Sequence, residues 1–312
     1  MTLQQLEYIV AVYKEKSFSK AADKCFVTQP TLSMQIQKLE EVLGVVIFDR
    51  SKQPVVATSL GREIIAIAQD VLKDTQRIRE MVEDAKGQVS GDLRIGIIPT
   101  VAPYLVPMFL TDFLAQYPKV NLILEEMPTD DIVRDLKIDL LDAGILVTPL
   151  SDLNIKETPL YYEPFVAYVS PTSGMYAQDL LSPKDMDLSE IWLLNEGHCM
   201  QSQVINLCYE RKKRRLVPNF EYRAGSIETL RKMVELNEGA TLLPELALKD
   251  LQENQKKMVR RFETPEPVRE VSMVTHRNYV KKGLLNALLG CIKAHIPQDM
   301  QNIDGKNRIS IH

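Results

Sequence analysis

Residues 3–12 carry apolar side chains three or four positions apart, as one face of a helix requires. These side chains are Leu3, Leu6, Ile9 and Val10. The pattern predicts an amphipathic first helix. A short second helix is expected around Ala21 and Ala22, whose small side chains allow close helix packing, with Ser17 or Ser19 as its N-cap.

A third helix is expected to begin after Thr28, a favourable N-cap, with Pro30 in its first turn, and to stop at Gly44. A turn at residues 26–27 precedes it. Its expected buried face consists of Leu32, Ile36, Leu39 and Leu43. Its opposite face carries Gln29, Thr31, Ser33, Gln35 and Lys38. Such side chains suit base edges and phosphates in a major groove, although a merely solvated helix face would have the same periodicity.

Residues 45–58 predict two short strands around a turn at Ser51–Pro54. Arg50 and Lys52 stand near the tip of this hairpin. They would allow it to contact phosphate or the minor groove as a wing.

Residues 59–86 contain no proline, and their apolar side chains follow a single heptad register. The register comprises Leu60, Ile64, Ile67, Val71, Ile78, Met81 and Ala85, and Asp74 interrupts it. One apolar stripe on so long a helix favours pairing with a second copy of the chain. Packing against its own chain is the alternative.

The segment Gly87–Asp92 has the composition of a linker, and the pattern changes after it. Strand-like runs there alternate with helical stretches such as Tyr104–Gln116. The runs are Leu93–Ile98, Val120–Glu125, Ala143–Val147, Phe165–Val169, Ile191–Leu194 and Val271–Thr275. This alternation predicts an α/β domain whose ligands lie at the carboxyl ends of strands and at helix N-termini.

Length and composition change this picture little. A chain of 312 residues, 45% hydrophobic and 26% charged, is expected to form two or more globular domains. Its net charge of −4 argues against nonspecific coating of nucleic acid, so DNA binding depends on the motif. No export signal opens the chain, and no apolar run reaches the roughly 18 residues of a membrane helix. We therefore expect a cytoplasmic protein with no membrane partner, and we predict neither a metal nor a cofactor.

Two cysteines, Cys199 and Cys208, lie nine positions apart, with His198 directly before the first. On one helix their Cα atoms would be about 13 Å apart, whereas a disulfide tolerates roughly 4.4–6.8 Å. Closing this pair would thus require the backbone to refold, as in a redox switch. The plainer interpretation is that a buried cysteine acts as a small hydrophobic residue, as we expect for Cys25 and Cys291.

The N-terminal segment resembles the winged helix-turn-helix of LysR-type transcriptional regulators. The resemblance is carried by the alanine pair of the second helix, by QPxLSxQI in the third, and by LExxLGxxxFxR before the wing. It implies an α+β multi-domain protein with a long linker helix and an effector domain like the periplasmic binding proteins. That domain would have two α/β subdomains joined by crossover strands. The expected boundaries are 1–58 for the DNA-binding domain, 59–91 for the linker helix and hinge, 92–300 for the regulatory domain and 301–312 for a tail.

Within that family, the C-terminal half resembles the peroxide-sensing OxyR regulators. The matching stretches are GIIPTVAPYLVP, GHC with a second cysteine nine positions on, SIETLRKMVELNEGATLLPELA and PEPVRE. The resemblance implies that Cys199 reacts with hydrogen peroxide and that Cys208 resolves it as a disulfide. It implies a peroxide pocket formed by Thr100, Thr129, Gly197, His198 and Arg269. Val268, next to Arg269, departs from a more basic pattern in the family.

The resemblance also implies a homotetramer of two dimers that binds double-stranded DNA, activates genes of oxidative-stress defence and is not an enzyme. RNA polymerase is an expected partner, and thioredoxin or glutaredoxin the expected reductant. The basic run Arg211–Arg215 departs from the family. It is either a solvated face or a source of positive charge near the switch.

Three other functions are compatible with parts of this sequence. A LysR-type regulator could sense a metabolite in its effector cleft, with incidental cysteines. A thiol peroxidase could use the same chemistry catalytically, although the segment 1–58 argues against it. The DNA-binding segment and the lack of an export signal likewise argue against a periplasmic solute-binding protein.

Overall fold

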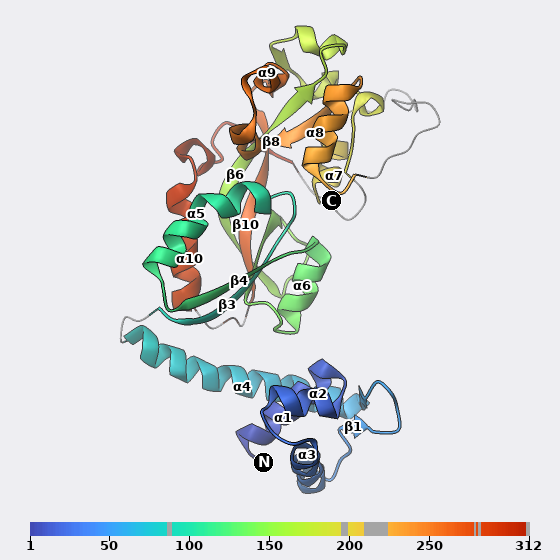
Figure 1. The fold of residues 1–312 in the computed structure, drawn as a ribbon, viewed down its shortest axis with the longest axis vertical. Helices are drawn as coiled ribbons and strands as arrows, with labels where there is room; N and C mark the ends of the chain where they lie inside the picture. Colours follow the sequence, from blue (N-terminus) through green and yellow to red (C-terminus); the bar gives the residue numbers. More distant parts are fainter. Residues whose placement is uncertain (86–88, 195–198, 209–223, 278, 280–281, 310–312) are drawn as a thin grey trace. The chain divides into compact units, whose positions relative to one another are not determined.

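The computed structural model describes residues 1–85, 89–194, 199–208, 224–277, 279 and 282–309, without the side chains of Asp185, Cys199 and several residues between 73 and 85. The chain divides into two compact units, Met1–Gln88 and Val89–His312. Figure 1 shows the fold coloured along the chain.

The first unit begins with three short helices, each started by a recognisable cap. Thr2 and Gln5 form a capping box at the start of α1 (Leu3–Glu15). The Ser17 hydroxyl accepts a hydrogen bond from the Lys20 amide and starts α2 (Phe18–Lys24). Pro30 stands in the first turn of α3 (Gln29–Leu43), and Gly44 ends that helix in the left-handed region, with φ of 67°. The expected Ser17 cap is therefore confirmed for the second helix. The third helix begins after Thr28 and ends at Gly44 as expected, but the Thr28 side chain makes no capping hydrogen bond.

These helices enclose a small core built from the predicted faces. Its fully buried side chains include Ile9, Val12, Ala21, Leu32, Ile36 and Leu39. The prediction for Leu43 is wrong, since 38% of this residue is exposed. It is the last residue of α3, where Gly44 turns the chain away from the core. The wing is confirmed as a hairpin in which β1 (Phe48–Asp49) pairs with β2 (Val56–Ala57).

The long helix α4 (Ser59–Ala85) carries two apolar stripes. Ile65 and Ala68 are 1% and 2% exposed and pack into the core of the first unit. Of the predicted heptad positions, Ile64 packs against this core, whereas Leu60, Ile67, Val71 and Ile78 are 48%, 65%, 39% and 64% exposed. The side chains of Met81 and Ala85 lie outside the described residues.

The second unit is a curled mixed sheet covered by helices. Its strand order is β4-β3-β5-β10-β6-β9-β7, with β8 beside β6 and β11 beside β10. The strands are β3 (Gly91–Ile97), β4 (Val120–Glu126), β5 (Ala143–Thr148), β6 (Ile155–Val169), β7 (Leu180–Leu181), β8 (Ala240–Pro244), β9 (Val259–Phe262), β10 (Glu266–His276) and β11 (Lys306–Arg308).

Two long antiparallel strands, β6 and β10, connect the halves of this unit. Beyond its pairing with β6, β10 pairs with β5 in the first half, whereas the end of β6 pairs with β8 and β9 in the second. They are the crossover strands implied by the family resemblance.

Helices cover both halves. In the first half, Figure 1 shows α5 (Ala102–Gln116) and α10 (Lys282–His295) on one side of the sheet and α6 (Thr129–Lys137) on the other. The second half carries α7 (Cys199–Leu207), α8 (Ile227–Leu236) and α9 (Glu253–Lys256). Five 3-10 turns are also described: Gly174–Ala177, Pro183–Asp185, Leu188–Glu190, Glu245–Asp250 and Gln298–Met300.

The strand predicted at Ile191–Leu194 is wrong. This segment makes only isolated bridges, from Ile191 to Ala240 and from Leu194 to Ala224. The two bridges lead to different segments, so no continuous ladder forms, and the Trp192 carbonyl accepts instead from the Thr241 hydroxyl over 2.9 Å. The other predicted strands are present, with β6 and β10 much longer than the sequence indicated.

In the described part of the chain, no helix is long and apolar enough to cross a membrane. Nor do the described histidine, cysteine and carboxylate side chains form a cluster that could hold a metal ion.

Candidate functional site

The outer face of α3 presents the polar residues expected to read DNA. Gln29, Pro30, Thr31 and Lys38 are exposed, whereas Ser33 and Gln35 are half-buried. The Thr28 and Thr31 hydroxyls share a hydrogen bond of 2.8 Å, and Thr28 does not cap the helix with its side chain. The first amides of α3 therefore gain no acceptor from this residue, which suits a helix end that meets a phosphate.

Arg50 ties the wing to α3. Its guanidinium donates to the Glu40 carboxylate over 2.9 Å and to the Ser33 hydroxyl over 3.3 Å, and it lies 5.2 Å from the centre of the Phe18 ring. Glu40 also accepts hydrogen bonds from the Ile47 and Phe48 amides. With 40% of its side chain exposed, Arg50 both fixes the wing and remains accessible to solvent.

Phe26, in the turn between α2 and α3, has an unusual exposure and backbone conformation. It is 96% exposed, and its φ of 55° lies in the left-handed region. A bulky residue rarely adopts this conformation, and such strain often marks functional positions. Its exposed aromatic ring close to the start of α3 makes Phe26 a candidate functional residue. The apolar pattern of the sequence did not predict this.

In the second unit, Thr100 and Thr129 occupy equivalent positions after neighbouring strands. β3 and β4 are parallel, and Ile97 at the end of β3 pairs with Glu126 at the end of β4. Each threonine follows its strand end by three residues, and both are nearly buried, at 4% and 9% exposed. Because the carboxyl ends of parallel strands share one edge of a sheet, both threonines lie at the edge where ligands are expected.

Arg269 is the centre of a buried polar network at this edge. Its guanidinium donates to the Thr100 hydroxyl over 3.2 Å and to the Thr100 carbonyl over 2.9 Å. It also forms an ion pair of 2.7 Å with Glu163, and the two side chains are 1% and 0% exposed. The second oxygen of Glu163 accepts the Leu246 amide hydrogen over 3.0 Å. The network thus connects the β3–α5 loop, both crossover strands and the turn after β8.

Sequence reasoning missed Glu163, although a carboxylate within the apolar run LYYEPFVAYV was a visible signal. Glu163 lies directly opposite Arg269 in the β6–β10 pairing. Nearby, burial and the Glu163 charge raise the pKa of Tyr161 well above its ordinary value, despite the opposing charge of Arg269. The site therefore contains a fixed guanidinium whose charge is balanced by a carboxylate.

The two candidate redox cysteines stand at opposite ends of α7. The helix begins at Cys199, and the Cys208 amide continues its pattern by donating to the Val204 carbonyl over 3.0 Å. Nine residues of helical rise separate their Cα atoms by about 13 Å. Cys208 is a free, half-buried thiol packed against the core, and burial raises its pKa to about 12. Cys208 is therefore held in an unreactive, protonated form.

Gly197, His198 and the basic run 211–215 lie outside the described residues. Their predicted roles therefore remain predictions.

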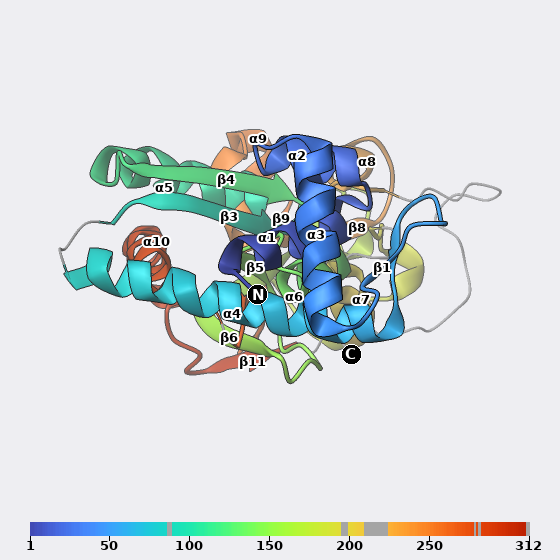
Figure 2. The same cartoon turned by 90° about the horizontal axis from the view of Figure 1, so that it is seen from below.

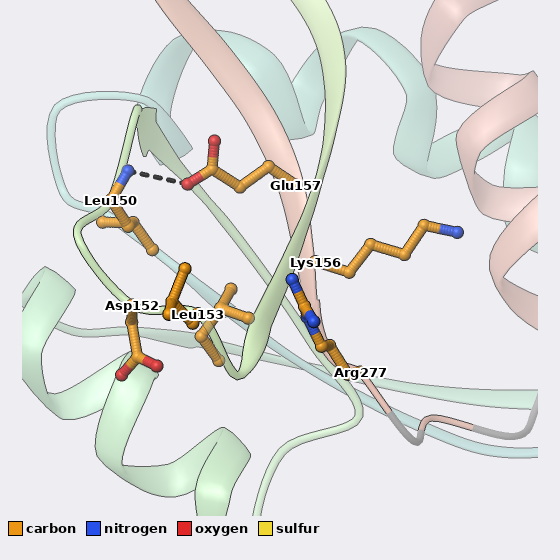
Figure 3. Close-up of a pocket in the computed structure, with 7 residues that line it drawn as sticks. Leu150, Asp152, Leu153, Lys156, Glu157 and Arg277 are labelled. Atoms are coloured by element: carbon orange, nitrogen blue, oxygen red, sulfur yellow. Dashed lines mark hydrogen bonds between the residues drawn. The ribbon is translucent and has the colours of Figure 1, made fainter.

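A separate shallow pocket lies at the far end of the crossover strands (Figure 3). It is lined by Leu150, Asp152, Leu153, Ile155, Lys156, Glu157 and Arg277. Arg277 follows Arg269 by eight residues, which is about 26 Å along an extended strand. This pocket is therefore distinct from the Arg269 network.

His295, at the end of α10, has an acceptor at each ring nitrogen, one within α10 and one on α5. One contacts the Cys291 carbonyl and the other the Asp112 carboxylate, each at 2.8 Å. Since both partners are acceptors, the doubly protonated imidazolium is favoured. The hydrogen bond to Cys291, followed by that to Asp112, raises the pKa of His295 above its ordinary value.

We expect this link to make stability depend on pH. The pKa of His295 is higher in the folded protein than its unfolded value of about 6.5. Protonated His295 therefore stabilises the folded state fully at pH values below about 6.5. The stabilisation is lost as the pH rises through the raised pKa. The difference in melting temperature between the wild type and Asp112→Asn should therefore shrink as the pH rises above about 6.5. An unchanged difference across this range would contradict the assignment.

The helix-turn-helix with its wing, the long helix with an exposed apolar stripe and the two-part α/β unit together define a class. It is that of DNA-binding transcriptional regulators with an attached effector domain.

Two family models cover most of the chain. "Bacterial regulatory helix-turn-helix protein, lysR family" matches residues 3–62, and "LysR substrate binding domain" matches residues 86–297. The chain belongs to the LysR family, in its OxyR group. It is a transcriptional regulator and not an enzyme, which removes the thiol-peroxidase alternative.

Individual relatives agree with this assignment. The hydrogen peroxide-inducible genes activator of Haemophilus influenzae is 34% identical over 276 residues, which are 88% of this chain and 90% of that protein. Full-length OxyR from Pseudomonas aeruginosa, with a cysteine-to-aspartate substitution, superposes with a TM-score of 0.77 at 33% identity, covering 95% of this chain and 99% of that one. An OxyR cysteine-to-serine variant from Corynebacterium glutamicum with hydrogen peroxide bound superposes with a TM-score of 0.60 at 26% identity, covering 94% of each chain.

Proposed function

We propose that this protein is a transcriptional activator of oxidative-stress defence genes that senses hydrogen peroxide through a reversible Cys199–Cys208 disulfide. The observation that carries the proposal is the position of these residues at the two ends of one helix, with the Cys208 thiol packed against the core. The names of the relatives support the choice of hydrogen peroxide as the signal.

The chemistry needs two steps. The Cys199 thiolate attacks one peroxide oxygen, the O–O bond breaks, and the second oxygen leaves as water after taking up a proton. This step leaves a sulfenic acid on Cys199. The Cys208 sulfur then attacks the sulfenic sulfur, and the S–O oxygen leaves as a second water. Overall, two thiols are oxidised to one disulfide and one peroxide is reduced to two waters.

The peroxide pocket would be formed by Thr100, Thr129, Gly197, His198 and Arg269. A threonine hydroxyl can both donate to and accept from a small neutral peroxide. Since the Thr100 oxygen already accepts from Arg269, its own hydrogen is oriented away from the guanidinium and is suited to donate. Arg269 thus fixes the loop that carries Thr100, while Glu163 balances its charge.

Closure of the disulfide requires α7 to unwind. Its ends are about 13 Å apart in the helix, whereas a disulfide tolerates at most roughly 6.8 Å between Cα atoms. Unwinding also releases Cys208 from the environment that raises its pKa to about 12. Oxidation is therefore coupled to a change of fold in the second unit.

The proposed mechanism also requires a surface that binds DNA, formed by α3 and the wing. Its proposed contacts with double-stranded DNA are Gln29, Pro30, Thr31, Ser33, Gln35, Lys38 and Arg50. Two copies paired through α4 would present two reading helices to two half-sites, and two such dimers would form the homotetramer. RNA polymerase is the proposed partner in activation and thioredoxin or glutaredoxin the reductant, all in the bacterial cytoplasm.

The proposed dimer predicts the effect of one charge on α4. Ile67→Glu would place a carboxylate in the exposed stripe, where pairing would bury it without a partner. We expect sedimentation analysis to show a mass at or below half that of the wild type, with weaker operator binding. The matched control is Ala66→Glu, at an exposed position outside the stripe, which should leave the mass unchanged. Equal masses for both variants would contradict dimerisation through this stripe.

The proposal is tested by non-reducing peptide mapping of the reduced protein after a stoichiometric pulse of hydrogen peroxide. We expect a rapid Cys199–Cys208 link that thioredoxin or glutaredoxin reverses. If both thiols remain free, or oxidise no faster than Cys25 and Cys291, the sensing proposal fails. Sensing of a metabolite by the effector unit would then be the function to test, by ligand-dependent footprints that ignore reductant.

A further inference from the structure

The face of α7 that packs into the core contains one polar residue. Met200, Val204 and Leu207 on this face are 2%, 4% and 9% exposed, as expected for apolar side chains. Gln203 lies among them and is 0% exposed. A buried amide costs free energy unless it is hydrogen-bonded, so an apolar residue would be the simpler choice here.

The partner of this amide is the C-terminal segment of the chain. The Gln203 side-chain nitrogen donates to the main-chain carbonyl of Ile309 over 3.1 Å. This contact joins the middle of the proposed switch helix to a residue more than a hundred positions away. It is broken by any refolding that unwinds α7.

The segment that ends at Ile309 is held firmly to the sheet. β11, labelled in Figure 2, runs parallel to β10 and pairs with it at Glu266–Val268. The Ile309 amide donates to the Val268 carbonyl over 2.9 Å, and Ile309 is 7% exposed. Arg308 donates to the Glu270 carboxylate over 2.9 Å. The segment therefore contacts β10 on both sides of Arg269 and α7 at its centre.

We infer that Gln203 is a positioning residue for the redox reaction and that the C-terminal strand, through Ile309, holds α7 in its helical, dithiol form. This inference rests on the proposed function, since it assigns the contact a role in the Cys199–Cys208 equilibrium. Closing the disulfide must withdraw Gln203 from Ile309. The C-terminal strand then loses one of its attachments, and oxidation loosens the segment that pairs beside Arg269.

The first test measures the thiol–disulfide equilibrium of the full chain in glutathione buffers. Gln203→Met keeps the approximate length of the side chain and removes both the donating nitrogen and the buried amide oxygen, which has no hydrogen-bond partner among the described residues. Because one hydrogen bond of the dithiol form is lost, we expect the equilibrium constant to shift roughly threefold to tenfold toward the disulfide. That corresponds to a reduction potential about 14–30 mV lower. Gln201→Met, at a half-buried position on the same helix, is the matched control and should leave the potential unchanged.

A chain that ends after Arg308 removes the acceptor instead of the donor. It also removes the Ile309–Val268 hydrogen bond and the buried Ile309 side chain, so its own shift in the same direction can be larger. Adding Gln203→Met to the shortened chain should add little, because the acceptor of the Gln203 amide is already gone. A fully additive double variant, or a Gln203→Met potential equal to that of the wild type, would overturn the inference.

Hydrogen exchange of backbone amides, measured in the wild type and in Gln203→Met, gives a second readout. The amides of Lys306–Ile309 should exchange faster in the oxidised than in the reduced wild type, and faster in reduced Gln203→Met than in the reduced wild type. Equal exchange in all three states would also overturn the inference. If the wild type forms no Cys199–Cys208 disulfide, the proposed function fails. The comparison of the two reduced proteins still tests the contact with Ile309.

Discussion

Replacing Cys199 with serine is expected to reduce the peroxide-dependent increase in promoter activity to background while leaving DNA binding by the reduced protein intact. The thiolate is the nucleophile, and a serine hydroxyl does not ionise near neutral pH. The measurement is a promoter assay with and without hydrogen peroxide, together with operator binding in reductant. This is the largest effect that we expect from a single substitution, because burial raises the pKa of the thiols of Cys25, Cys208 and Cys291 and so keeps them protonated.

Cys25→Ser is the matched control for this experiment. Cys25 is half-buried in the first unit, and burial together with the Glu7 charge raises its pKa, so its thiol is protonated at neutral pH. The control should respond to peroxide as the wild type does. Cys208→Ser should instead stop the reaction at the sulfenic acid, detectable with a sulfenic-acid probe. A Cys199→Ser protein that still responds to peroxide would refute the mechanism.

Breaking the Arg269–Glu163 pair is expected to produce the largest loss of stability. Both side chains are almost completely buried, so Glu163→Gln leaves the guanidinium without its counter-charge. Removing one partner of such a pair typically costs about 3–5 kcal/mol. Urea unfolding can be followed by the fluorescence of Trp192, the single tryptophan of the chain, which is buried in the second unit.

A surface pair supplies the comparison. Arg261 and Glu245 are 2.6 Å apart, and 50% and 18% of their side chains are exposed, so Arg261→Gln should cost only about 1 kcal/mol or less. The double variant Glu163→Met with Arg269→Leu should be more stable than the sum of its single changes predicts, because it leaves no unpaired charge. If Glu163→Gln and Arg261→Gln lower the free energy of unfolding equally, the buried Arg269–Glu163 pair does not stabilise the fold more than a surface pair.

Local sequence signals determined the first unit almost completely. Caps such as Ser17, the proline and glycine that bracket α3, and the spacing of Leu32, Ile36 and Leu39 are short-range features that act within a few residues. Leu43 failed because periodicity does not show where the neighbouring core ends. The long helix was also evident from the sequence, but its second stripe at Ile65 and Ala68 became clear only from the packing of the unit.

The α/β nature of the second unit was likewise evident from its sequence, and the GHC motif with its distant cysteine indicated where to look for chemistry. Tertiary structure decided the rest. Strands β6 and β10 are long because each pairs with different partners along its length, information that no window of sequence contains. The pairing of Arg269 with Glu163 joins residues 106 positions apart, and that of Gln203 with Ile309 also spans 106. Such buried polar contacts depend on which strands become neighbours. The sequence by itself therefore determined only the candidate redox cysteines and the helix predicted to read DNA. Only the folded chain decided which side chains hold them in place.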